Sequence, residues 1–453
     1  MKRATKREEH VRKIRAAMRG GAGSPDLASI LGLIQPEDLA EIMADLDPGE
    51  RIAVFNHLDL KTAGIVLDDT DPLTTKDLLD NIDERLMAHV LGRMPADEAA
   101  DAIAEVEPER AQELFARMPP EESEEIRDIL QYPEDSAGGI MSPVLVTVED
   151  SMTVDAAIEQ LRESDIEEEY YYIYVLDREG VLIGVVPLRR LLTAQRGTPI
   201  REIMERKVVK SRVDTDQEEV AGLVRKYDLP ALPVVDAEGR LVGRVTADDA
   251  IDVITEEATE DIYHLAGLSE EDRVFTSARV SVRKRLPWML LNLATAFTAG
   301  AVIGLFENTL EQLVSLAVFL PVVAGVAGNG GIQALTVITR AIALGEIEFS
   351  SGLRVVGKEI QVGLVVGVAA GLLSGLIAYL WHGNPIVGLV LLLAMVSTMT
   401  VAGLLGAGIP LILKALGQDP ALGSGVLLTF CTDAIGFFSF LGIATLLISR
   451  LAV

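Results

Sequence analysis

The sequence predicts a multidomain membrane protein with an all-α, solenoid-like N-terminal domain, an α/β tandem pair of repeats and an all-α transmembrane domain of five helices. Three observations predict it. Of the 68 acidic and 40 basic residues, only seven and five lie after residue 285, so an acidic first part precedes an apolar second part. The first part contains two internal repeats, one helical and one with strands. The second part contains apolar segments long enough to cross a bilayer.

Residues 1–33 are predicted to form a basic arm. Positions 1–19 hold eight Lys or Arg and two Glu, with Val11, Ile14 and Met18 at helical spacing. They lack the apolar core of a secretory signal peptide. Such an arm could lie on an anionic membrane surface, pack against the protein's own acidic domain, or stay solvated and partly disordered.

Residues 34–135 are predicted to be an acidic helical domain. Proline followed closely by acidic residues recurs at Pro36, Pro48, Pro95, Pro108 and Pro120. Proline suits the first turn of a helix, and acidic residues there favour the positive end of the helix dipole. Spacings near twelve residues favour a solenoid of short stacked helices, with an irregular helical bundle as the alternative.

Residues 136–254 contain a repeat with strands. Residues 173–177 (IYVLD) recur as residues 232–236 (LPVVD), and residues 184–186 (GVV) recur as residues 243–245 (GRV), both at an offset of 59. Each copy is predicted to be strand, turn, strand and helix, after an amphipathic helix such as residues 153–161. This pattern resembles a tandem pair of CBS domains.

The CBS resemblance implies ATP or another adenine nucleotide as a ligand. In the second copy, Thr246 and Asp249 stand where the family's Thr and Asp meet a ribose and a phosphate. In the first copy Pro187 and Arg190 stand at the corresponding places, so that half-site departs from the pattern. As the alternative, Thr246 only caps the helix that it begins.

Four apolar windows predict five membrane spans, because one window has double length. The windows are residues 286–306, 313–339, 360–413 and 420–449, and the double one folds back at residues 381–385 (WHGNP). Residues 255–285 are assigned to a linking helix region and residues 286–453 to the transmembrane domain. Basic residues in the short loops place the acidic domains in the cytoplasm, beside the cell inner (plasma) membrane, and the C-terminus outside.

Asp433 is the only charged residue among residues 420–449. A carboxylate at that depth is costly unless it faces protein, water or an ion, so intramembrane acids mark functional sites. Every Lys and Arg of the transmembrane domain lies near a span end or in a loop. We therefore predict an ion pathway at Asp433, with a structural ion pair or hydrogen bond as the alternative.

Acidic residues also gather in the first part, where a divalent cation would relieve their mutual repulsion. One group lies on the helix that enters the membrane domain, and a second lies in the second strand repeat. A pair lies one helical turn apart in the helical domain. For any single residue a solvated acidic face is the alternative. The predicted cation-sensing residues are Asp249, Asp252, Glu257, Glu260 and Asp261, then Asp216, Glu218 and Asp228, then Asp97 and Asp101.

Five motifs carry a wider resemblance: residues 133–141 (PEDSAGGIM), 257–261 (EATED), 328–333 (GNGGIQ), 419–421 (DPA) and 432–436 (TDAIG). Together with the domain order, they make the chain from about residue 36 resemble an MgtE-type magnesium transporter. The resemblance implies a homodimer with a pore along its twofold axis, gated by cytosolic Mg²⁺, and a plug helix over residues 249–267. Two departures are Ile332, where members often carry a small polar residue, and Gly425-Val426, in place of a more usual Asn-Pro.

The predicted function is Mg²⁺ uptake that cytosolic Mg²⁺ shuts off. Because Mg²⁺ holds its water shell tightly, we expect the pore to bind the hydrated ion through carboxylates and carbonyls. The predicted pore residues are Asp433, Asn329, Gln333 and Asp419. Expected partners are a second copy of the chain, the lipid bilayer and divalent cations, but not nucleic acid, which so acidic a chain repels.

Two other functions remain open. The chain could be a CBS-regulated transporter of Co²⁺, Mn²⁺ or Ni²⁺, or a membrane-anchored sensor of Mg²⁺ or nucleotide that conducts nothing. The sensor is disfavoured by Asp433, which a mere anchor does not need. The sequence carries no complete P-loop and no zinc-ligand spacing, and we predict that the protein is not an enzyme.

Overall fold

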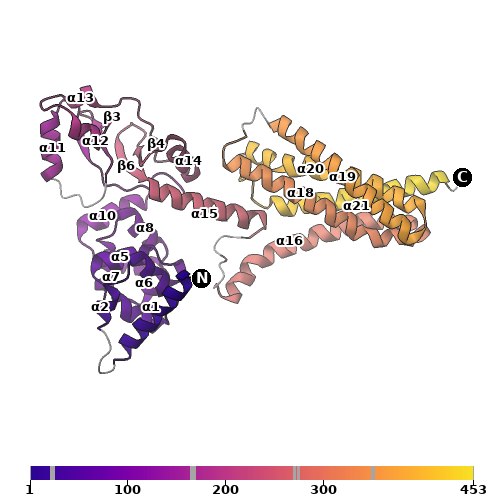
Figure 1. Cartoon of the computed structure of the whole chain (residues 1–453), viewed down its shortest axis with the longest axis horizontal. Helices are drawn as coiled ribbons and strands as arrows, with labels where there is room; N and C mark the ends of the chain where they lie inside the picture. Colours follow the sequence, from indigo (N-terminus) through magenta and orange to yellow (C-terminus); the bar gives the residue numbers. More distant parts are fainter. Residues whose placement is uncertain are drawn as a thin grey trace. The chain divides into compact units, whose positions relative to one another are not determined.

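The computed structural model describes residues 2–20, 26–163, 170–268, 272, 276–347 and 352–451. The chain separates into two compact parts, Met1–Ile254 and Thr255–Val453, called here the N-terminal part and the C-terminal part. The N-terminal part holds the helical domain and both strand repeats, and the C-terminal part holds the long apolar helices (Figure 1).

The helical domain is a solenoid, so the irregular bundle is excluded. Its helices α3 to α10 begin at residues 36, 48, 60, 72, 84, 96, 108 and 120, one every twelve residues. Each helix contacts the next but one along the chain, from α3 with α5 to α8 with α10, so two rows of helices stack. The bounds are α3 (Pro36–Met43), α4 (Pro48–Phe55), α5 (Leu60–Asp68), α6 (Pro72–Asn81), α7 (Glu84–Leu91), α8 (Ala96–Ala104), α9 (Pro108–Phe115) and α10 (Pro120–Ile129).

Aspartate caps mark three helix starts that the pattern of proline followed by acids did not reveal, although α6 also has Pro72 in its first turn. Asp59, Asp71 and Asp83 precede α5, α6 and α7, and their carboxylates accept hydrogen bonds from backbone N–H groups of the first turn. Pro95 occupies the N-cap position of α8, so the prediction that it lies inside the first turn is wrong by one residue.

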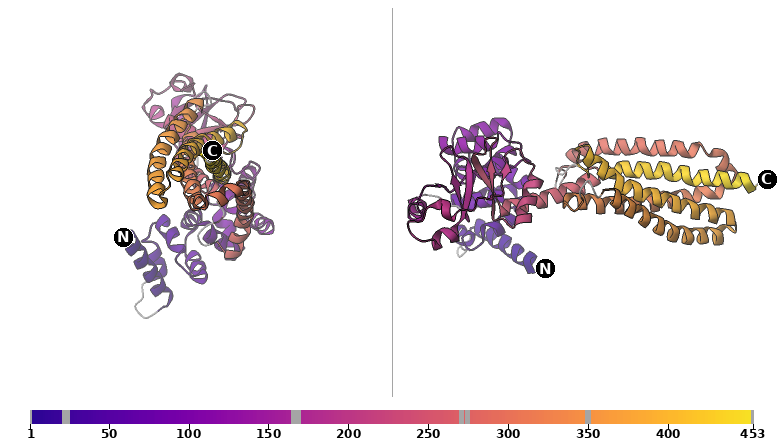
Figure 2. Two further views of the ribbon diagram at one scale, coloured as in Figure 1. Left: turned by 90° about the vertical axis from the view of Figure 1, so that its right-hand side faces the viewer. Right: turned by 90° about the horizontal axis from the view of Figure 1, so that it is seen from above.

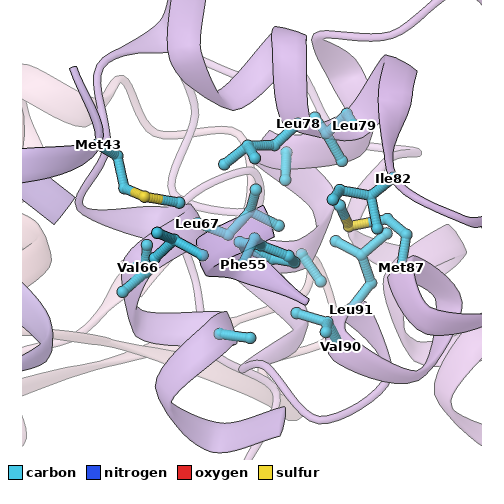
Figure 3. Close-up of a cluster of buried hydrophobic side chains, with 14 of the residues drawn as sticks. Met43, Phe55, Val66, Leu67, Leu78, Leu79, Ile82, Met87, Val90 and Leu91 are labelled. Atoms are coloured by element: carbon cyan, nitrogen blue, oxygen red, sulfur yellow. The ribbon is translucent and has the colours of Figure 1, made fainter. Parts of the chain in front are cut away.

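A continuous hydrophobic core joins these short helices. Phe55, Leu67, Leu78 and Leu91 are at most 1% exposed, and Figure 3 shows them gathered from different helices. Helices of two to three turns are marginal alone in water. Each fully buried large apolar side chain contributes roughly 1.5–3 kcal/mol, so the stack, rather than the single helix, is the stable element.

The basic arm packs on the solenoid. It forms α1 (Lys2–Met18) and α2 (Leu27–Leu31), and Val11 and Ile14 are buried in the solenoid's core cluster. Arg15 donates to Glu50 at 3.0 Å, and Arg7 pairs with Asp45 at 2.5 Å. Of the three placements considered for the arm, contact with the protein's own acidic domain is the one observed.

The two strand repeats form two three-stranded sheets. In the first, β2 (Tyr172–Leu176) lies between parallel β1 (Thr147–Glu149) and antiparallel β3 (Leu182–Pro187). In the second, β5 (Ala231–Val235) lies between parallel β4 (Ser211–Arg212) and antiparallel β6 (Leu241–Thr246). The accompanying helices are α11 (Val154–Glu163), α12 (Leu188–Thr193), α13 (Ile200–Ile203), α14 (Gln217–Tyr227) and α15 (Ala247–Leu265).

Among its described residues, the C-terminal part contains five segments long and apolar enough to cross a membrane, as predicted. The helix α16 starts at Ala278, eight residues before the apolar window, so the four basic residues within 279–285 occupy its first two turns. The predicted fold-back is confirmed, because α19 ends at His382 and α20 begins at Pro385. The bounds are α16 (Ala278–Gly304), α17 (Glu307–Gln312), η1 (Val314–Phe319), α18 (Leu320–Ala343), α19 (Gly352–His382), α20 (Pro385–Ala415) and α21 (Ser424–Leu451).

A glycine stripe joins α19 and α20, which run side by side in Figure 2. Gly363, Gly367, Gly371 and Gly375 lie four residues apart on α19, and each faces the backbone of α20. A β-carbon at Gly371 would lie 2.8 Å from the carbonyl oxygen of Leu392, closer than real contacts allow. Small residues at this spacing let two membrane helices meet backbone to backbone.

Candidate functional site

Asp433 of α21 lines a cavity of about 440 Å³ in the C-terminal part. The walls come from the end of α15 and from α16, α18 and α21. The polar lining residues are Asn292, Thr295, Thr336, Thr429 and Asp433. No residue that the structure describes forms an ion pair or hydrogen bond with the Asp433 carboxylate, so the described residues do not support the alternative of a structural pair.

The other predicted pore residues do not share this cavity. Asn329 and Gln333 are exposed on α18 and are not among its lining residues, whereas Ile332 between them is. Asp419 lies before α21, where its carboxylate accepts a hydrogen bond from the backbone of Ala421 at 2.8 Å. Within one chain the structure therefore brings Asp433 together with Asn292 and three threonines. The sequence analysis singled out neither Asn292 nor the threonines.

The C-terminal end of α15 docks on the start of α21 and closes one wall of the cavity. Leu265 and Ala266 line it, and the N–H of Gly423 donates to the carbonyl of His264 at 3.3 Å. A β-carbon at Gly425 would clash with the carbonyl oxygen of Leu265. Only glycine admits this backbone approach, which explains physically why the chain carries Gly425 here.

Trp288 of α16 covers the same junction. β-Carbons built at Gly267 and Gly423 would lie 3.4 Å and 3.0 Å from its indole ring, so both loop segments pack directly on it. Val426 also lies 3.4 Å from the β-carbon position of Gly267. The end of α15, the start of α21 and α16 therefore form one packed contact.

Acidic side chains surround this docked end of α15. Nδ1 of His264 lies 2.8 Å from Asp419 and 3.4 Å from Glu260. Burial, together with the nearby carboxylates of Asp419 and Glu257, raises the pKa of Asp261 to about 6. The structure thus brings four predicted acids together, and His264, which was not predicted, lies among them.

A second acidic group lies inside the N-terminal part, between the solenoid and the second CBS repeat. Desolvation by the surrounding protein and the carboxylates of Asp69, Asp252 and Asp249 raise the pKa of Asp68 to about 6, although Asp68 itself is exposed. The pKa of Asp249 is also raised, chiefly by burial. The sequence analysis missed Asp68 and Asp69, because two acids at the end of one helix look like an ordinary solvated cap.

The remaining predicted acids have local roles in the structure. Asp216 caps α14 by accepting from the backbone N–H of Glu218 at 2.9 Å, and Asp228 ends that helix in the left-handed conformation, φ 51°. Asp97 is buried on α8, which also carries Asp101. Among the described residues, no three His, Cys, Asp or Glu side chains lie in a ready-made metal-binding arrangement.

The predicted nucleotide residues contact each other. The backbone N–H and the hydroxyl of Thr246 donate to one carboxylate oxygen of Asp249, at 2.9 and 2.6 Å. This is a helix-capping arrangement at the start of α15, with the carboxylate three residues on reaching back to the N-cap. These hydrogen bonds form the cap that the alternative describes, and the nucleotide site at Thr246 and Asp249 stays a prediction.

Comparisons with known proteins cover most of the chain. Residues 320–443 match the MgtE model, described as a divalent cation transporter; residues 34–135 match the MgtE intracellular N domain; and residues 137–197 and 200–256 match the CBS domain. The magnesium transporter MgtE of Thermus thermophilus is 40% identical over 326 residues, 71% of this chain and 72% of the relative. That of Bacillus subtilis is 35% identical over 324 residues, with the same coverage. The crystal structure of the cytosolic domain of the Mg²⁺ channel MgtE in complex with ATP, 38% identical, superposes with a TM-score of 0.51 over 54% of this chain and 99% of that one.

Proposed function

This chain belongs to the MgtE family of divalent cation transporters, and we propose that it carries Mg²⁺ across the membrane along a path lined by Asp433. The cavity beside Asp433 carries the proposal. Six waters of a hydrated Mg²⁺ occupy roughly 180 Å³ at about 30 Å³ each, less than half of the cavity's 440 Å³. One carboxylate and several hydroxyls can therefore bind the ion's water shell without removing it.

We propose that the docked end of α15 is the closed state of this path. Leu265 and Ala266 narrow the cavity, and the contact of the Leu265 carbonyl with Gly425 leaves no room for a side chain. The acids around Asp261 repel one another in this position, so a divalent cation bound among them favours docking. Mg²⁺ on the cytosolic side would then close the path that delivers it.

We propose that Mg²⁺ bound at the acids of the N-terminal part also favours the closed state. Asp68 and Asp69 of the solenoid lie near Asp249 and Asp252 of the second CBS repeat. The repulsion between these like charges disfavours the contact between the solenoid and the repeat. A bound Mg²⁺ would stabilise it. The remaining predicted sensors, Asp97, Asp101, Asp216, Glu218 and Asp228, stay candidates for further cation contacts.

The proposed setting is the cell inner membrane, with two copies of the chain forming the pore. The first part faces the cytoplasm, because the basic residues lie on the loops at that side, and the C-terminus lies outside. In such a dimer Asn329, Gln333 and Asp419, which do not line the cavity within one chain, are candidate contacts of the shared path.

An adenine nucleotide is proposed as a second ligand of the CBS pair. Thr246 and Asp249 match the half-site pattern, and their side chains lie at the surface of the second repeat, half-buried. The carboxylate of Asp249 is suited to accept hydrogen bonds from a ribose, in place of the hydroxyl hydrogen bond that it now accepts from Thr246. The solved relative that contains ATP supports this assignment.

Flux into proteoliposomes tests the proposed function. We expect Mg²⁺ uptake by the parent protein and almost none by Asp433→Asn, which keeps size and hydrogen bonding but removes charge. Glu346→Gln, an exposed loop acid of the same part, is the matched control. Uptake of Mn²⁺, Co²⁺ and Ni²⁺ in parallel tests the alternative substrates. A folded parent with no divalent uptake would support the sensor, and full Mg²⁺ uptake by Asp433→Asn would remove Asp433 from the path.

A further inference from the structure

Asn292 is the only amide side chain in the apolar stretch of α16, residues 286–304. Its neighbours Leu290, Leu291 and Leu293 are exposed on the surface of the single chain. A polar amide in a membrane span is unfavourable in lipid and usually faces protein or a water-filled space. We therefore expect the side chain of Asn292 to face a polar environment.

The described part of the chain supplies no protein partner for this amide. The backbone oxygen of Asn292 accepts from the hydroxyl of Thr295 at 2.8 Å, but no described residue hydrogen-bonds its side chain. The side chain is half-buried and lines the 440 Å³ cavity, as does Thr295 one turn later. The amide thus faces the same space as Asp433, which α21 contributes to the opposite side of the α16–α21 contact.

We propose that Asn292 is a specificity-determining residue of the ion path, and this rests on the proposed function. Waters around Mg²⁺ point their hydrogens outward, so the carbonyl oxygen of Asn292 can accept from them while Asp433 accepts from others. The amide also discriminates, because Mg²⁺ keeps its octahedral shell whereas larger or more easily dehydrated ions do not present the same fixed waters. Asn292 binds the hydrated ion and carries no charge of its own.

Asn292→Leu tests the proposal without harming membrane insertion, because leucine makes the span more apolar. We expect roughly tenfold lower Mg²⁺ flux, the worth of one hydrogen bond to a charged partner. Mn²⁺ flux should fall less, so the Mg²⁺ to Mn²⁺ ratio should drop. Asn292→Gln, which keeps the amide, should restore most of the ratio. Thr298→Val is the matched control, because Thr298 is exposed on the same helix and does not line the cavity.

The outcomes separate this inference from the function on which it rests. Absence of Mg²⁺ flux in the parent defeats the proposed function itself. A parent that conducts, an inactive Asp433→Asn and an unchanged Asn292→Leu overturn only the role of Asn292. If Asn292→Leu loses flux equally for all ions, or if its oligomer size changes on gel filtration, the role of Asn292 is structural and the proposal is also overturned.

Discussion

Asp261→Asn should stabilise the docked end of α15 in the absence of Mg²⁺. The carboxylate is half-buried near Asp419 and Glu257, and its pKa rises from 3.8 to about 6. At about 1.4 kcal/mol for each tenfold change, the ionised group costs the docked state up to about 3 kcal/mol at neutral pH. Because Asp261 keeps some solvent contact, screening reduces this value, and we expect about 1–2 kcal/mol, a roughly fivefold to thirtyfold shift toward docking.

The same argument fixes the sign of the pH dependence. Because its pKa is raised in the docked state, the Asp261 carboxyl keeps its proton up to a higher pH there than in the undocked state. The docked state is therefore stabilised as the pH falls below about 6, and this stabilisation is lost as the pH rises through 6. The contact between His264 and Asp419 is present in the parent and is not altered by the substitution. The difference between parent and Asp261→Asn therefore isolates the part due to Asp261.

Trp288 provides the assay. Its ring packs on Gly267 and Gly423, so its fluorescence reports docking once the other tryptophan is replaced in a Trp381→Phe background. We expect the Mg²⁺-free spectrum of Asp261→Asn to resemble that of the parent in Mg²⁺ and to change little between pH 7 and pH 5. Glu311→Gln, an exposed acid elsewhere in the C-terminal part, is the control. An unchanged or smaller docked fraction without Mg²⁺ would refute the repulsion argument.

Three further perturbations test neighbouring parts of the structure. Gly425→Ala places a β-carbon against the Leu265 carbonyl and should loosen docking. We expect Mg²⁺ flux to persist at high internal Mg²⁺, and inhibition as strong as in the parent would contradict this. Asp68→Asn should raise the Mg²⁺-free melting temperature and weaken its rise on acidification from pH 7 to pH 5, measured by thermal unfolding; a lower melting temperature would count against mutual repulsion. Ile14→Ala should destabilise the N-terminal part by about 2–4 kcal/mol in denaturant titration, whereas exposed Arg12→Ala should not; equal effects would mean that α1 is not part of the core.

The regular features of the fold were readable from the sequence. Proline before acids marked helix starts, and a 59-residue offset marked the strand repeats, because both patterns reflect local backbone preferences. The starts of α5 and α7 escaped notice, since their aspartate caps resemble any other acid in so acidic a chain, and the start of α6 escaped notice because no acid closely follows Pro72. The strands β1 and β4 have only three and two residues, too few to show alternation.

The candidate site was predictable only where one residue stood out by itself. Asp433 is conspicuous because lipid makes a lone carboxylate costly. Asn292, Asp68 and Gly425 gain meaning from neighbours that are far away in the sequence: the cavity shared with α21, the acids of the second CBS repeat, and the carbonyl of Leu265. Such pairings depend on tertiary packing, which no local pattern records.

The glycine stripe of α19 affects how genetic screens of this protein should be interpreted. Gly363, Gly367, Gly371 and Gly375 cannot accept any other residue without pushing the α20 backbone away. None of them lines the cavity beside Asp433. A random search for variants that no longer support growth on low magnesium will therefore return these positions often. Such hits report helices that fail to assemble, and only variants that reach the membrane in normal amounts can be assigned to the ion path.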